Sequence, residues 1–247
     1  MAPPLPVVIP CAGLGSRLGA LTRDCPKELL PIGGKPALHG VLLELTAAGV
    51  RDAVVVTSPR KPGIGAWVRE HAPAVVLVEQ PEPLGVFDAV ERARAALGTD
   101  RFVVLFPDYL HLPDQTGLAA VLDQLAGLPE EASAYPLVRR GPEHGGRLGP
   151  TASVSGAMQG PWLRIQEVGP SRPRGLHTIF AELRGTEHTR RLAGGDEGIG
   201  SLLSGLAADG LLFGVQLPGD VLDLGIPAGH ADAVARFHSG RACWRGR

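Results

Sequence analysis

Two glycines and two cations near the start of the chain have the types and spacing needed to bind a polyphosphate. Gly13 and Gly15 follow Ala12 and a short apolar run that is typical of a buried strand. Because glycine lacks a Cβ, the backbone there can turn its amides toward phosphate oxygens. Arg17 adds a planar guanidinium and Lys27 a flexible ammonium. A nucleoside triphosphate is the expected ligand, since its charge can be shared among these donors.

The glycine loop taken alone is also typical of a tight turn. The sequence excludes two common phosphate-binding motifs. It is not a dinucleotide fingerprint, because Leu18 stands at the place of the third glycine. It is not a Walker loop, in which the lysine directly follows a glycine. The longer pattern GLGSRL and PKELLP, over residues 13–18 and 26–31, resembles the GxGxRL and PKxLLP signature of the sugar-phosphate nucleotidyltransferases.

This resemblance implies both a fold and a reaction. The fold would be a Rossmann-like α/β fold with a mostly parallel mixed sheet flanked by helices. The reaction would be Mg²⁺-dependent transfer of a nucleoside monophosphate from a nucleoside triphosphate to a sugar 1-phosphate, with release of pyrophosphate. The expected nucleoside triphosphate is UTP or dTTP. In this reaction Arg17 and Lys27 would be catalytic, and Ala12, Gly13 and Gly15 would bind the nucleotide.

The rest of the pattern predicts elements that would place this loop at the edge of a sheet. The expected strands lie at 7–9, 53–57, 74–78, 102–106, 132–138, 163–168 and 211–217, with a buried segment at 175–183. The expected helices lie at 37–48, 63–71, 86–97, 115–125, 196–208 and 228–237. Alternating strands and helices favour a parallel sheet, whose ligands bind at the carboxyl ends of its strands. We expect one domain over 1–247, with a nucleotide-binding half at about 1–130 and an acceptor-binding half at about 131–240.

Two aspartates are the candidate metal ligands. Asp108 directly follows an apolar strand, a position from which a carboxylate can bind a hard cation such as Mg²⁺. Asp223 lies in an Asp-x-Gly turn between a strand and a helix. A helix cap or a turn would explain either acid by itself. The family resemblance assigns both to the metal, Asp108 as the acid that ends its strand and Asp223 as the second ligand.

A turn after the third expected strand is the candidate base-binding segment. The amide of Gln80 offers an acceptor and donors that suit the edge of a pyrimidine, and Gly85 would let the base lie close to the backbone. An ordinary strand-to-helix turn explains the same residues. The segment resembles the base-recognition turn of the family, so Gln80 and Gly85 are carried over as base contacts.

The acceptor site is the part in which this chain departs from the family. Gly149 weakly matches a glycine that approaches the sugar, and Glu167 could accept hydrogen bonds from sugar hydroxyls. Val168 stands where the family usually has a lysine, and valine cannot bind phosphate. Arg172 or Arg174 could supply the missing cation, although both also fit a solvated loop.

Composition limits the classes of partner and location. A net charge of −1 over 247 residues gives no electrostatic reason to bind nucleic acid or an anionic membrane, so small molecules are the expected partners. Nothing resembles a signal peptide or a membrane span, which makes the cytoplasm the expected location. Three cysteines without CxxC spacing favour reduced thiols, and Cys11 and Cys25 are expected to serve in packing. The oligomeric state cannot be inferred from these features.

Two other functions remain open. A regulatory module could keep the nucleotide pocket and lose turnover, which Val168 would permit and the retained Lys27, Asp108 and Asp223 argue against. Nucleotidyl transfer to a phosphate or phosphonate that is not a sugar would leave the nucleotide half intact and change the middle segment.

Overall fold

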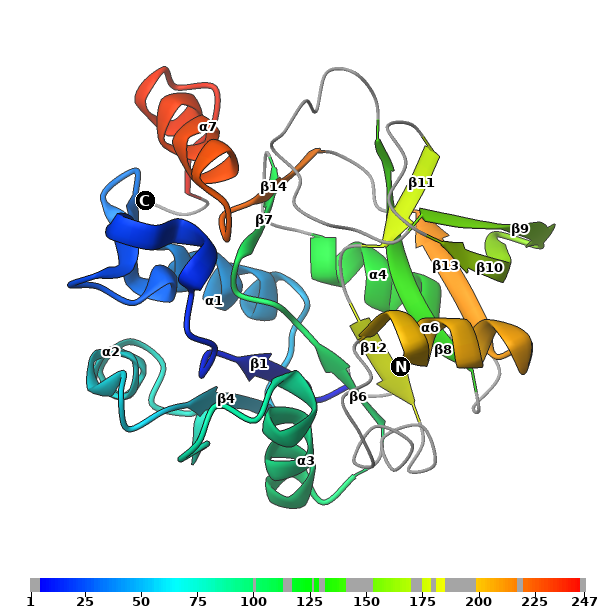
Figure 1. Ribbon diagram of the computed structural model, residues 1–247, viewed down its shortest axis with the longest axis horizontal. Coiled ribbons are helices and arrows are strands. Elements are labelled where there is room, and N and C mark those ends of the chain that lie inside the picture. The colour runs from blue at the N-terminus through cyan, green and yellow to red at the C-terminus, as the bar shows by residue number, and fades with distance from the viewer. Residues whose placement is uncertain are drawn as a thin grey trace.

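A mixed five-stranded sheet lies at the centre of the protein (Figure 1). The computed structural model describes residues 5–99, 101–112, 117–125, 127–128, 132–140, 153–169, 175–178, 181–184, 199–216 and 220–244. In sheet order the strands are β12 (Ala181–Arg184), β6 (Arg101–Val104), β1 (Val7–Pro10), β4 (Ala53–Thr57) and β5 (Val76–Glu79). The last four are parallel to one another, and β12 is antiparallel to β6. The predicted mostly parallel mixed sheet is therefore confirmed.

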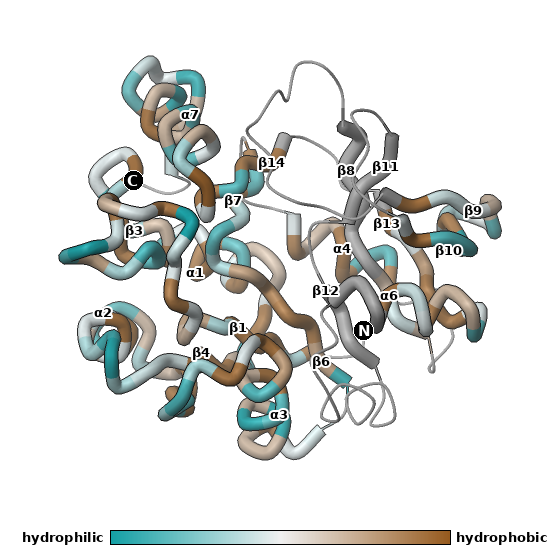
Figure 2. Tube along the Cα trace, in the orientation of Figure 1, coloured by the Kyte–Doolittle hydropathy of each residue, from teal (hydrophilic) through white to brown (hydrophobic). Residues whose placement is uncertain are grey.

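Helices cover both faces of this sheet because its central strands β1, β4 and β6 are apolar and buried on both sides. Val7 and Ile9 point to a core shared with α1 (Ala37–Ala47), α2 (Pro62–His71) and α4 (Gly117–Leu125). Val8, on the opposite face, belongs to a core shared with α3 (Val86–Leu97) and α6 (Ile199–Ala208). Figure 2 shows hydrophobic residues along β6 and a mixture of hydrophilic and hydrophobic residues in the helices. Strands buried on both faces are typical of parallel α/β sheets.

A second sheet, which closes on itself, occupies the other side of the molecule. Its strands are β8 (Ser133–Arg140), β9 (Ser153–Gln159), β10 (Trp162–Gly169), β11 (Gly175–Thr178) and β13 (Leu212–Gln216). Four of the five pairings are antiparallel, and β13 pairs parallel to β8. Sequence patterning predicts strands at three of these places but not their closure into a separate sheet. The expected buried segment at 175–183 is divided between β11 and β12, which belong to different sheets.

Two short antiparallel ribbons complete the architecture. β2 (Pro31–Ile32) pairs with β3 (Lys35–Pro36), and β7 (Tyr109–Leu112) pairs with β14 (Asp220–Asp223). A third apolar cluster joins β7 and β14 to α7 (Pro227–His238). Trp244 packs on this cluster and donates its indole N–H to the carbonyl of Ile32 at 2.9 Å, which attaches Trp244 to β2. Within the described residues, no helix is long and apolar enough to cross a membrane.

Candidate active site

The glycine loop lies immediately beyond the carboxyl end of β1. Gly15 has a φ of 70° and precedes a 3₁₀ segment, η1 (Ser16–Thr22), so its left-handed conformation favours glycine. Gly13 has no such conformation, and a Cβ added to it would meet no protein atom within 4 Å. The exposed backbone at Gly13 is therefore open to close approach. The loop ends in η1, which carries Arg17.

Lys27 comes from a second 3₁₀ turn, η2 (Lys27–Leu29), and points at Asp108. Its ammonium donates to Asp108 Oδ2 at 2.6 Å. Burial by itself lowers the pKa of Lys27, but the carboxylates of Asp108 and Glu28 raise it, and the net pKa lies above its ordinary value of 10.5. Lys27 is thus a permanent cation at physiological pH.

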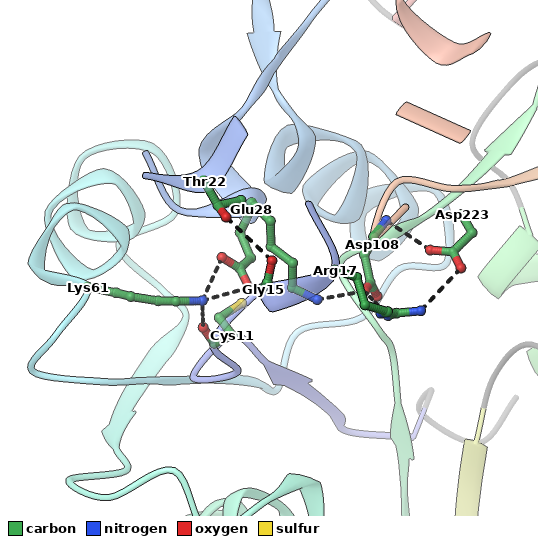
Figure 3. Close-up of polar contacts among 10 residues, drawn as sticks. Cys11, Gly15, Arg17, Thr22, Glu28, Lys61, Asp108 and Asp223 are labelled. Atoms are coloured by element: carbon green, nitrogen blue, oxygen red, sulfur yellow. Dashed lines mark hydrogen bonds and ion pairs between the residues drawn. The ribbon is translucent and has the colours of Figure 1, made fainter. Parts of the chain in front are cut away.

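Pairing between β7 and β14 brings the two predicted aspartates together. Asp223 lies opposite Tyr109 in this ribbon, and the Leu224 N–H donates to the Asp108 carbonyl at 2.6 Å. The two residues are almost fully buried, Asp108 with 7% and Asp223 with 0% exposed. Arg17 lies between them, 3.7 Å from Asp108 Oδ2 and 3.7 Å from Asp223 Oδ2 (Figure 3). Burial raises the pKa of Tyr109 well above its usual range, and both aspartates add to this effect.

Donor chemistry allows a test of whether these aspartates fit Mg²⁺. In the described ranges no group of three or more His, Cys, Asp or Glu side chains could hold a metal. Mg²⁺ is commonly bound by one or two carboxylates together with substrate phosphates and water, so two aspartates suffice. The guanidinium of Arg17 already lies between these carboxylates, which shows that their oxygens converge on a cation. The donor set therefore fits Mg²⁺ delivered with a nucleotide.

Gly225 belongs to this site although it was not among the predicted site residues. Its N–H donates to Asp223 Oδ1 at 2.8 Å. A Cβ built on it would lie 2.7 Å from Asp108 Oδ2, 2.9 Å from Arg17 Nη2 and 2.9 Å from Asp223 Oδ1. Any side chain here would push the three groups apart. The Asp-x-Gly pattern was the signal that could have identified it.

A buried ion pair supports the site from behind and was also missed. Glu28, which is 1% exposed, accepts from Lys61 Nζ at 3.1 Å and 3.0 Å. The same ammonium donates to the carbonyl of Cys11 at 3.0 Å (Figure 3). Burial raises the pKa of Glu28, although Lys61 and Lys27 lower it. Lys61 therefore joins the end of β1 to the turn that carries Lys27, and no local sequence signal connects residues so far apart in the chain.

The predicted base-binding residues lie together at the start of α3. Gln80 follows β5, is 3% exposed and donates its side-chain amide to the Gly85 carbonyl at 2.9 Å. Gly85 has φ 92° and ψ 179°, a conformation almost restricted to glycine. A Cβ added there would meet no protein atom within 4 Å. The turn therefore requires glycine at position 85, and within the described part of the chain the space beside Gly85 is free of protein atoms.

The structure describes only part of the predicted acceptor site. Glu167 lies on β10 with its side chain exposed, and Ser155 Oγ donates to it at 3.0 Å. Its neighbour Val168 is half-buried against the core below α3 and α6. Gly149, Arg172 and Arg174 lie outside the described residues. The described contacts of Glu167 do not connect it to either aspartate.

The two cysteines near the loop have the character of packing residues. Burial raises the pKa of the Cys11 thiol well above its ordinary value, and burial also raises that of Cys25. Both thiols are therefore protonated at neutral pH and poorly nucleophilic.

Comparison with known proteins places the chain among nucleotidyltransferases. The family model of the MobA-like NTP transferase domain matches residues 7–204. UTP–glucose-1-phosphate uridylyltransferase of Escherichia coli K12 is 33% identical over 129 residues, which are 42% of this chain and 43% of that enzyme. The uridylyltransferase YngB of Bacillus subtilis is 30% identical over 166 residues, 53% of this chain and 56% of that protein. The chain thus matches about half the length of these curated relatives.

Solved structures share the fold at lower sequence identity. UDP-glucose pyrophosphorylase in complex with UDP-glucose superposes with a TM-score of 0.80 at 19% identity, covering 96% of this chain and 99% of that one. UTP-bound UGPase of Acinetobacter baumannii gives a TM-score of 0.75 at 21% identity and covers 94% and 93%. These likenesses confirm the Rossmann-like nucleotidyltransferase fold. Because the family model spans most of the 247 residues, the chain belongs to the family of MobA-like NTP transferase domains.

Proposed function

We propose that this protein transfers a nucleoside monophosphate from UTP or dTTP to a sugar 1-phosphate, with Mg²⁺, and forms an NDP-sugar and pyrophosphate. One observation carries the proposal: Arg17 and Lys27 converge on Asp108 and Asp223 at the end of the glycine loop. Two cations beside two buried acids suit a polyphosphate that arrives with a divalent ion. The similarity to uridylyltransferases supports the same reaction.

The roles follow from the charges that change during transfer. An oxygen of the acceptor phosphate attacks the α-phosphorus, and the bond between this phosphorus and the bridging oxygen to the β-phosphate breaks. Arg17, Lys27 and the amides of Ala12, Gly13 and Gly15 would stabilise the negative charge that grows on the departing pyrophosphate. The acceptor oxygen is already anionic, so no general base is needed. Positioning and neutralisation are then the main tasks of the protein.

Asp108 and Asp223 are the residues that would hold Mg²⁺. When bound, the ion would neutralise phosphate oxygens and orient the triphosphate. Gly225 supports the arrangement because its N–H fixes one oxygen of Asp223, and its missing side chain leaves room beside both acids. Arg17, whose side chain is 50% exposed, is free to turn from the acids to the phosphates.

The division of the chain into two halves is part of the proposal. Residues 1–130 would bind the nucleotide, with Gln80 and Gly85 contacting the base. Residues 131–240 would bind the acceptor, through Glu167 and through Gly149, Arg172 and Arg174. We place the enzyme in the cytoplasm, where nucleoside triphosphates are available.

A second function is favoured by Val168. This residue is apolar and half-buried in the core, so it cannot bind a sugar phosphate as the family's lysine would. Transfer to a different phosphate or phosphonate would explain the change. A nucleotide-binding module without turnover is the remaining alternative.

The direct test is a matrix of four nucleoside triphosphates against sugar 1-phosphates, with Mg²⁺ and a pyrophosphate readout. Release that depends on a sugar 1-phosphate supports the proposal. Release only with another phosphate or a phosphonate favours the second function. Nucleotide binding without release under every condition favours the binding module.

A further inference from the structure

The side-chain amide of Gln80 is held in one orientation by two acceptors. Its Nε2 donates to the Gly85 carbonyl at 2.9 Å and to Asp88 Oδ2 at 2.8 Å. A carbonyl and an ionised carboxylate accept hydrogen bonds and cannot donate them. Turning the amide over would place its oxygen against both acceptors and leave a buried polar atom without a partner, which costs about 1–3 kcal/mol. Both hydrogens of Gln80 are therefore committed to the protein.

Asp88 is itself held in the ionised form. Arg92, one turn further along α3, donates from Nε to Asp88 Oδ2 at 2.7 Å. This hydrogen bond lowers the pKa of Asp88, and the bond from Gln80 adds to the effect. The pair of Asp88 and Arg92 thus keeps an obligate acceptor against the amide of Gln80 at neutral pH.

The carbonyl oxygen of Gln80 is what remains for a ligand. Within the described residues, no donor contacts Gln80 Oε1. This oxygen is also not fully buried, so a ligand can reach it. An acceptor at this position pairs with a base edge that carries an imino N–H, as uracil and thymine do at N3. Cytosine has an acceptor at N3, and two acceptors facing each other repel.

We propose that Asp88 is a positioning residue for base selectivity: it fixes Gln80 so that the amide oxygen meets the base, and so favours UTP and dTTP over CTP. The inference rests on the proposed contact between Gln80 and the base. Asp88 itself acts through Gln80 and does not touch the nucleotide.

The test compares Asp88→Asn with Glu91→Gln. The asparagine can donate as well as accept, so it removes one of the two acceptors that oppose the turned amide of Gln80 and leaves only the Gly85 carbonyl. Glu91 is the matched control, because it lies on the same helix, pairs with Arg94 at 3.0 Å and has a similar exposure, 29% against 24% for Asp88. Affinities for UTP and CTP are measured by calorimetry without acceptor, and kcat/KM for both is measured with acceptor.

The wild type should prefer UTP to CTP, and Asp88→Asn should reduce this ratio at least about tenfold, as expected for one misplaced hydrogen bond. Glu91→Gln should leave the ratio unchanged. An unchanged ratio in Asp88→Asn, or a wild-type preference for CTP or a purine, would overturn the inference. If the asparagine variant does not fold, Asp88→Ser gives the same comparison. Absence of turnover in the wild type would count against the proposed reaction, whereas the binding ratio would still test Asp88.

Discussion

Opposite charges are closely balanced at the candidate site: Arg17 contacts both Asp108 and Asp223, and Lys27 contacts Asp108. In the proposed reaction, a bound polyphosphate would replace the carboxylates as the partner of these cations. Lys27 is the better anchored of the two, with a side-chain exposure of 14% against 50% for Arg17. Lys27 is therefore expected to act at a fixed place, and Arg17 to move.

Replacement of Lys27 by alanine should lower kcat/KM by about 10²- to 10³-fold, the range seen when one stabilising donor is removed. Affinity for the free nucleoside should not change, because the ammonium would contact phosphates alone. Steady-state kinetics and calorimetry measure the two effects. Lys35→Ala, which removes an exposed lysine from β3, is the control. Equal losses of affinity for the triphosphate and the nucleoside would argue against this role.

The raised pKa of Lys27 leads to a prediction about pH. A lysine whose pKa is raised in the folded protein keeps its charge below its ordinary pKa of 10.5, and loses it only as the pH rises through the higher folded value. Lys27→Arg keeps the charge throughout. Both proteins should therefore show pH–rate profiles of the same shape from pH 7 to about 10. A fall on the basic side that disappears in the arginine variant would contradict the assignment.

Gly225 offers a test of how tightly the acids are packed. Gly225→Ala should reduce activity by about 10²-fold or more, since misplacement by about 1 Å can cost that much. The free energy of unfolding of Gly225→Ala should fall by about 1–3 kcal/mol, because the added methyl group crowds the two acids. Gly205→Ala is the control, because a Cβ there meets no atom within 4 Å, and it should retain activity. Kinetics and urea denaturation measure both variants, and full activity in Gly225→Ala would mean that the observed spacing is not required.

At the scale of elements, the site depends on connections between segments that are distant in the sequence. The ribbon of β7 and β14 places Asp223 beside Asp108. The pair of Glu28 and Lys61 holds η2 against the end of β1. The charges of Glu28 and Lys61 are buried, so loss of either partner leaves the other charge uncompensated.

The pair of Glu28 and Lys61 should show strong coupling. Glu28→Gln and Lys61→Met should each lower the free energy of unfolding by about 3–5 kcal/mol, because each leaves one buried charge unpaired. The double variant should lose less than the sum, since no unpaired charge remains. Urea denaturation of the four proteins gives the coupling energy. Arg60→Gln, in an exposed pair with Glu82, should change stability by less than about 1 kcal/mol. Additive losses at Glu28 and Lys61 would show that they act separately.

Local elements could be predicted from the sequence, and long-range pairings could not. The helix at 86–97 was predicted with its observed bounds, and in the structure Gly85 and Gly98, both with positive φ, flank it. The strand at 53–57 was predicted equally well from its apolar run. By contrast, nothing local shows that Lys61 pairs with Glu28, or that 175–178 and 181–184 join different sheets. Such choices depend on packing over the whole chain.

At the scale of the whole molecule, both ends of the sequence contribute to one site. The glycine loop directly follows the first strand, β1, whereas Asp223 and Gly225 come from the segment just before helix α7 (Figure 1). The third apolar cluster and the contact of Trp244 with Ile32 hold this late segment in place. A fold that joins the two ends in this way makes the candidate site depend on complete folding of the described chain.

The measurement that tests the central claim most directly is pyrophosphate release by the wild type, Asp108→Asn and Asp223→Asn at limiting Mg²⁺ with UTP and a sugar 1-phosphate. The wild type should release pyrophosphate and form the NDP-sugar in equal amounts, as judged by mass spectrometry. Each asparagine variant should remain folded and lose nearly all release, because it removes a charged ligand from a hard cation. Asp24→Asn, at an exposed position, should match the wild type. Near wild-type release by either asparagine variant of the site would contradict the account.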